Sequence, residues 1–140
     1  MRMLTGFALF LMLSFSAGDA TAQAATSQLL DGMEIEYTYA DGGTVVASFD
    51  DGRLSYRWTA GPFAGTAVAD RIYQSRQIGE ALYMVSWHDA ENRNFATLVF
   101  DFEQDREYGS ALVGYGTDQS VFLFDEATIQ RTTGRPPSGR

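Results

Sequence analysis

The feature that most constrains the fold of this 140-residue chain is an alternation of apolar and polar residues with a period of two. In the first such stretch Met33, Ile35, Tyr37 and Tyr39 alternate with polar side chains. Successive side chains of a β-strand point to opposite faces, so this pattern predicts a strand with one buried face. Helical periodicity is weak after residue 30, and the chain is therefore expected to be all-β.

Strand-like runs recur along the rest of the chain, separated by turn residues. The breaks Asp41-Gly42-Gly43 and Asp50-Asp51-Gly52 are typical of β-hairpins, because glycine adopts positive φ angles at little cost. After the first run, the expected strands are Thr44–Phe49, Arg53–Thr59, Thr66–Tyr73, Ala81–His88, Phe95–Asp101, Arg106–Val113 and Ser120–Phe124. Short strands joined by sequential hairpins predict a single up-and-down antiparallel β-barrel of about eight strands. Such a barrel is filled by side chains or holds one small ligand.

The N-terminus has the three-part layout of a secretory signal peptide. Arg2 precedes an apolar stretch from Leu4 to Ala17, which is shorter than the roughly 20 residues of a membrane-spanning helix. Two cleavage motifs follow, Ala20-Thr21-Ala22 and Ala22-Gln23-Ala24. We expect residues 1–24 to be a signal peptide, residues 25–131 the barrel domain and residues 132–140 a flexible tail. A cleaved signal predicts a periplasmic or secreted protein with no membrane span in the mature chain.

Composition removes several classes of function. The chain has no Cys and a single His, His88, so disulfides, thiolate nucleophiles and multi-histidine metal sites are excluded. All ten basic residues are Arg, and the net charge of −8 argues against binding of nucleic acid through its phosphates. We expect neither a metal nor a cofactor, and the sequence leaves the oligomeric state open.

Aromatic side chains gather on the predicted inner face of the barrel. Tyr37 and Tyr39 share one face of the first strand, and Tyr83 and Trp87 share a face of the fifth, with Asp89 at its end. Rings accompanied by a few polar groups are typical of a small-molecule pocket. The pattern by itself favours core over pocket, since tyrosines pack well in strands, and Asp89 would then be a turn residue.

Two segments resemble the calycin-like group that contains the phenolic acid decarboxylases and the MoaF-like proteins. They are IEYTYADG, which includes Tyr37-Thr38-Tyr39, and LYMVSWHD, which includes Tyr83 and Trp87. The likeness extends over about residues 33–113. It implies an eight-stranded, lipocalin-like barrel with a cavity for a small molecule. The segment SWHDAENRNFATLVFDFE looks closer to the MoaF-like proteins than to the decarboxylases.

The resemblance to the decarboxylases also implies a mechanism. These enzymes act without a cofactor on para-hydroxycinnamic acids: a tyrosine pair and an arginine bind the substrate's oxygens, and a glutamate handles the proton. By position the tyrosines become Tyr37 and Tyr39, the glutamate becomes Asp89 and the arginine becomes Thr66. Aspartate is one methylene shorter than glutamate, and threonine lacks the guanidinium that clamps a carboxylate.

Three functions follow as alternatives. The first is an exported MoaF-like barrel that binds a small, aromatic molecule through Tyr37, Tyr39, Tyr83, Trp87 and Asp89. The second is a cofactor-free lyase that decarboxylates a phenolic acid, with Asp89 as proton donor and Tyr37 and Tyr39 on the substrate oxygens. The third is a structural or interaction protein whose barrel interior is filled.

Overall fold

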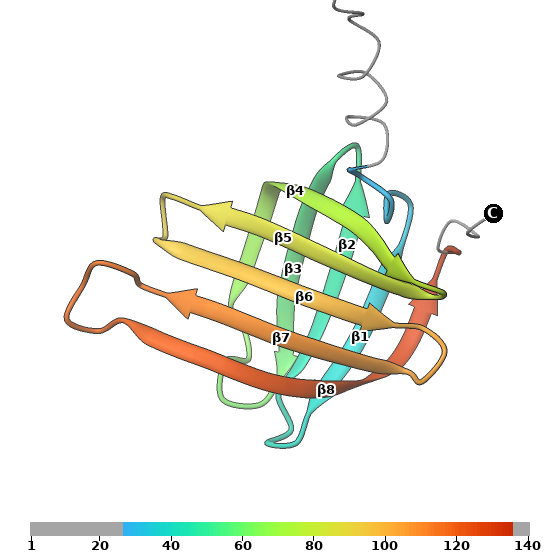
Figure 1. The fold of residues 1–140 in the computed structure, drawn as a ribbon. Coiled ribbons are helices and arrows are strands. Elements are labelled where there is room, and N and C mark those ends of the chain that lie inside the picture. Colours follow the sequence, from blue (N-terminus) through green and yellow to red (C-terminus); the bar gives the residue numbers. More distant parts are fainter. Residues whose placement is uncertain (1–26, 136–140) are drawn as a thin grey trace, which may run out of the picture.

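A computed structural model describes residues 27–135, and all their regular structure is β-strand (Figure 1). The strands are β1 (Glu34–Tyr39), β2 (Thr44–Asp50), β3 (Arg53–Ala60), β4 (Ala67–Gly79), β5 (Leu82–Asp89), β6 (Asn94–Asp101), β7 (Arg106–Val113) and β8 (Val121–Thr133). Each pairs antiparallel with the next, and β8 pairs with β1, so the sheet closes into a barrel. The predicted all-β, eight-stranded, up-and-down barrel is therefore confirmed.

The predicted signal peptide, residues 1–24, lies outside the described residues. Residues 27–135 contain no helix with the length and apolarity that a bilayer crossing requires.

In the barrel wall, β5 to β8 run across the direction of β1 to β3 (Figure 1). β4 joins the two directions by bending along its length (Figure 1). The bend coincides with a backbone irregularity: Asp70 has a φ of 58°, and the β3–β4 register shifts between Leu54 and Tyr56. A register shift arises when one strand has an extra residue relative to its partner, and such a residue locally increases the bend and twist of the strand.

A two-residue hairpin joins β2 to β3 at one of the predicted turns. Asp50 pairs with Arg53, and Asp51 and Gly52 form the two-residue connection with φ angles of 47° and 70°. Two successive positive φ angles characterise the turn whose twist matches that of the flanking strands.

Two strands are longer than the sequence pattern predicts. β4 continues past Tyr73 to Gly79, and β8 continues past Phe124 to Thr133. In β8 the acidic residues after Phe124 hide the alternation, but pairing with β7 on one side and β1 on the other extends the strand. β8 therefore includes Thr132 and Thr133, the first two residues of the expected tail, which pair with Ile35 and Glu34.

Inward-facing aromatic and aliphatic side chains form one core. Tyr37, Tyr83 and Trp87 belong to a single buried cluster, and Tyr39 packs against it. The predicted convergence of the odd-numbered side chains of β1 and β5 inside a closed barrel is thus confirmed.

The segment before β1 closes one end of the barrel. Leu30 is fully buried, and the Gly32 amide donates to the carbonyl of Phe49. The Asp31 carboxylate accepts hydrogen bonds from the Gly52 amide, at 2.9 Å, and from the Tyr73 hydroxyl, at 2.6 Å. We call this part of the molecule, Leu30 to Gly32 with Phe49, Gly52 and Tyr73, the closed end.

Candidate functional site

The tyrosine pair predicted from the sequence lies together inside the barrel. The ring centroids of Tyr37 and Tyr39 are 5.8 Å apart, and Tyr37 also meets Phe100 edge to face at 5.8 Å. Tyr37 is only 4% exposed, and its hydroxyl makes no hydrogen bond among the described residues. Burial holds the pKa of Tyr37 well above its ordinary value, so this phenol stays protonated.

A buried glutamate that the sequence analysis did not single out faces this pair. In β7 Glu107 pairs with Ala127 of β8, which pairs with Tyr39 of β1, so these residues lie in one row across the sheet. The side chain of Glu107 has no solvent exposure. Among residues 27–135 neither carboxyl oxygen has a hydrogen-bond partner of good geometry, although a looser hydrogen bond with the Tyr39 hydroxyl influences the ionisation of the carboxyl.

Burial sets the protonation state of Glu107. Loss of water is the main cause that raises the pKa of its carboxyl, a hydrogen bond from Tyr39 lowers this pKa in part, and the charge of Asp125 raises it again, so that the resulting pKa is about 8. At neutral pH the group is therefore mostly a carboxylic acid, which can both donate and accept a hydrogen bond.

A glycine makes room for this carboxyl. A Cβ atom on Gly109, two residues along β7, would lie 2.7 Å from Oε1 of Glu107 and 3.1 Å from a methyl carbon of Leu98. Any larger residue at position 109 would displace the Glu107 side chain or Leu98. Gly109 thus permits the inward conformation of Glu107.

Trp87 adds a second polar group without a partner. Its indole Nε1 is buried and has no hydrogen-bond acceptor in the part of the chain that the structure describes. Its ring lies 5.8 Å from that of Tyr56, which is half-buried on β3. The interior therefore carries an indole donor in addition to the Glu107 acid. We call Tyr37, Tyr39, Trp87 and Glu107 the interior polar set.

Asp89 is buried at the end of β5 and serves the turn that follows it. Its carboxylate accepts from the backbone and side-chain nitrogens of Asn92, at 3.1 and 2.7 Å, and forms an ion pair with Nε of Arg71 at 2.9 Å. Burial alone would raise the pKa of Asp89, but these partners lower it below the ordinary value. An ionised carboxylate accepts hydrogen bonds and is poorly suited to donate a proton at neutral pH.

Asp89 influences the tyrosine pair electrostatically through Tyr56, which lies between them in the chain of pKa effects. Burial raises the pKa of Tyr56, and the charge of Asp89 raises it further, while Tyr56 in turn contributes to the raised pKa of Tyr37. No contact joins Asp89 directly to Tyr37 or Tyr39 among the described residues.

The remaining predicted residues lie in ordinary structural positions. Tyr83 is 1% exposed and packs against Phe102 at 5.8 Å. Thr66 is exposed in the β3–β4 connection, where its carbonyl accepts from the Trp58 amide at 2.8 Å. Arg71 is the one arginine of residues 27–135 that is partly buried, and its Nε forms the ion pair with Asp89. Its parity with Tyr73 is a signal present in the sequence.

Closed antiparallel topology and an aromatic interior with few polar groups define a calycin-type barrel. The MoaF-like family model matches residues 31–120, and the chain belongs to the MoaF-like family. No curated protein matches it. Among solved structures, a Burkholderia vietnamiensis protein described as a putative beta-lactamase is similar, with a TM-score of 0.64 and 24% sequence identity. The match covers 74% of this chain and 95% of that one, and it supports the fold alone.

Proposed function

We propose that this protein is an exported MoaF-like barrel that binds a small, neutral aromatic molecule in its interior. The observation that carries the proposal is that Glu107 lies wholly buried beside the tyrosine pair with no hydrogen bond of good geometry. A buried polar group without a partner costs about 1–3 kcal/mol. A ligand that pairs with it recovers that cost on binding.

The interior groups favour a phenol over an anion. Tyr37 and Tyr39 stay protonated, and Glu107 is mostly a neutral acid at pH 7. These groups offer donors and acceptors without a positive charge, so a phenolic hydroxyl suits them better than a carboxylate does. The surrounding rings then stack against an aromatic ligand.

A run of aromatic side chains leads from this interior to the surface. Tyr39 stacks on Trp58 with a centroid distance of 5.7 Å, and Trp58 meets Phe63 at 5.1 Å. Exposure rises along this run from Tyr37, which is buried, to Phe63, which is 49% exposed. We propose this run as the entrance for the ligand.

A phenol library screened by thermal shift, with calorimetry on the hits, tests the proposal. The native protein should be stabilised by a neutral phenol. Glu107→Leu, which keeps the bulk and removes the polar atoms, should weaken binding by about 10-fold to 100-fold through loss of hydrogen bonds worth ~1–3 kcal/mol. Glu107→Gln should retain part of the affinity.

Tyr73→Phe is the matched control, because it removes a buried tyrosine hydroxyl at the closed end. This variant should bind as the native protein does. The proposal fails if no phenol stabilises the native protein, or if Tyr73→Phe and Glu107→Leu weaken binding equally.

A cofactor-free lyase acting on phenolic acids is the second candidate. The observation in its favour is again Glu107, since a carboxyl that is protonated at neutral pH beside two tyrosines can supply the proton that adds to the substrate's double bond. The test is loss of the ultraviolet band of p-coumaric acid. Asp89→Asn should abolish turnover if Asp89 is the donor, whereas Glu107→Gln should abolish it if Glu107 is. Absence of turnover in the native protein excludes the lyase and leaves the binding proposal standing.

Export rests on the pattern of the first 24 residues. Mass spectrometry of the protein recovered from the periplasm or medium should give a chain that begins at Ala25, or at Gln23 if the earlier motif is cut. Recovery of the intact chain from the cytoplasm would contradict export.

A further inference from the structure

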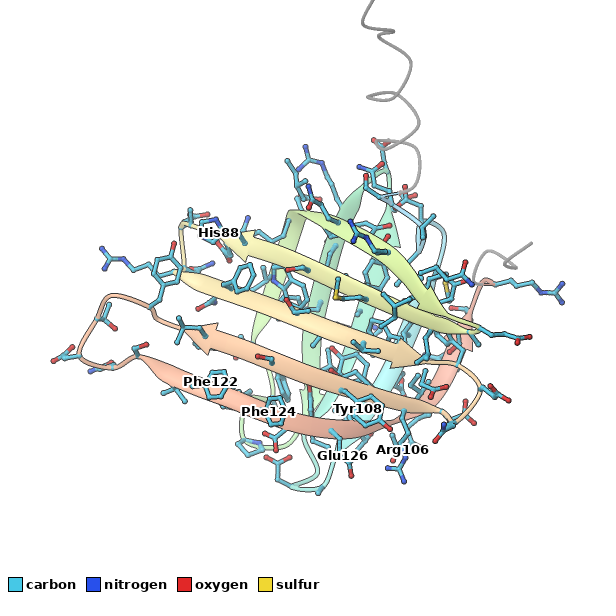
Figure 2. The ribbon with its side chains drawn as sticks, in the orientation of Figure 1. His88, Arg106, Tyr108, Phe122, Phe124 and Glu126 are labelled. Carbon is cyan, nitrogen blue, oxygen red and sulfur yellow. The ribbon has the colours of Figure 1, made fainter. Side chains whose placement is uncertain are left out.

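The outer face of β6, β7 and β8 carries an exposed apolar stripe. Its members lie on three adjacent strands, and Figure 2 shows Tyr108, Phe122 and Phe124 along β7 and β8. Pairing places Phe95 opposite Leu112 and Leu112 opposite Phe122. The exposed fractions are 48% for Phe95, 42% for Tyr108, 38% for Leu112, 66% for Phe122 and 78% for Phe124. We call these five residues the outer stripe.

The outer stripe is large enough to form the centre of a protein interface. A large aromatic side chain has about 150–250 Å² of surface, so at these exposures the stripe presents roughly 500 Å². That area is at the upper end of the roughly 300–600 Å² of the largest apolar patch on a typical monomer. Each partner contributes ~800 Å² to a stable interface, so the stripe would supply more than half of that area and its polar neighbours the remainder.

Charge favours a second copy over a membrane as the occupant. The chain has a net charge of −8 and no Lys, so an anionic lipid surface and a second copy are both repelled at long range, and the local charges of the face decide between them. Thr97 and Ser110 lie between the apolar residues of the face, and the acidic residues Asp125 and Glu126 border it along β8. At one end Arg106 and Glu126 supply one charge of each sign (Figure 2).

A groove lies beside the outer stripe, next to Phe124, which is the most exposed side chain of the stripe. This shallow groove of about 480 Å³ lies across β6 to β8, and its lining includes Thr97, Gly109 and Ser110. These small residues leave a depression next to Phe124, which is 78% exposed and pairs across the sheet with Ser110. The same face thus holds both a protruding ring and a recess.

A two-fold axis brings these features together. An axis in the interface plane, parallel to β7 and β8 and between them, places each β8 residue of one copy over its cross-strand partner on β7 of the other. Phe124 then lies over Ser110, and Phe122 lies over Leu112. Arg106 of each copy comes one row from Glu126 of the other, within reach of an ion pair.

We propose that the outer face of β6, β7 and β8 is a two-fold interface between two copies of this chain, with Phe124 of each copy seated beside Ser110 of the other. This interface lies on the opposite surface of the sheet from the interior polar set. The proposed interface can therefore be tested independently of ligand binding.

Sedimentation velocity of the purified protein at micromolar concentrations tests the interface. The native protein should sediment with twice the mass of the chain, and Phe124→Glu should sediment as a monomer. Ile72→Glu is the matched control: Ile72 is 66% exposed on β4, away from the stripe, and this variant should remain a dimer. If Phe124→Glu does not fold by circular dichroism, Ser110→Phe fills the groove without removing an apolar residue and should also give a monomer.

The charged end provides a further test of the orientation. Arg106→Glu and Glu126→Arg should each weaken the dimer at low salt, and the double exchange should restore it. A monomeric native protein overturns the proposal, including one that binds phospholipid vesicles through this face. So does a dimer that survives Phe124→Glu or Ser110→Phe, or one that Ile72→Glu dissociates equally.

Discussion

Two regions of the barrel interior, the closed end and the surroundings of Glu107, contain similar aromatic side chains. They differ in whether their buried polar groups are hydrogen-bonded. At the closed end the Tyr73 hydroxyl and the Gly52 amide both donate to Asp31. Around Glu107 the carboxyl and the Tyr37 hydroxyl have no hydrogen bond of good geometry. Folding alone favours the first arrangement, because buried polar groups are normally paired. The proposed binding of a phenol depends on the second arrangement.

The largest effect should come from the core of the closed end. Phe49 is 2% exposed and meets Tyr73 at 5.0 Å, so Phe49→Ala should lower the free energy of unfolding by about 3–5 kcal/mol. Trp58→Ala, at the proposed entrance, should cost less, because Trp58 is partly solvated. Urea unfolding at pH 7 measures both. Equal losses would show that the two regions do not differ in packing.

The next largest effect should be a pH dependence that belongs to Glu107. Its folded pKa of about 8 is raised above the ordinary 4.5, so its contribution to stability is complete below pH 4.5 and is lost as pH rises toward 8. The loss should be roughly 1 kcal/mol for each pH unit in that window. Unfolding curves of Glu107→Gln should lack this component. Parallel pH profiles of the two proteins would contradict it.

The smallest effect separates two buried tyrosine hydroxyls. Tyr73→Phe should destabilise the protein by about 1–2 kcal/mol, because it removes a hydrogen bond to the Asp31 carboxylate. Tyr37→Phe should change stability by less than about 0.5 kcal/mol, since no such bond is lost. Thermal unfolding of both variants measures the difference. A larger loss for Tyr37→Phe would mean that this hydroxyl is paired within the folded protein.

Alternation and turn chemistry were sufficient to predict the barrel. Strict period two in β1 and β5 places Tyr37, Tyr39, Tyr83 and Trp87 inward, and Asp51-Gly52 specifies a two-residue hairpin. The lengths of β4 and β8 escaped the prediction because charged residues interrupt the apolar pattern there. Their extent depends on neighbouring strands that are distant in sequence.

The candidate site was predicted in part. Tyr37 and Tyr39 do lie together, but Asp89 is engaged by Arg71 and Asn92. Glu107 was missed because Arg106-Glu107-Tyr108 has the polar composition of an exposed strand end. The sequence did contain a signal for Glu107, because Gly109 lies two residues further along and so on the same face of β7. A glycine within a strand often marks a close approach of another group.

The most direct measurement is a ¹³C NMR titration of the Glu107 side-chain carboxyl, assigned by comparison with Glu107→Gln. A midpoint near pH 8 is expected, and a bound neutral phenol should shift it. A midpoint close to 4.5 would show that the carboxyl is solvated, and the contrast between the two ends of the barrel would then be lost.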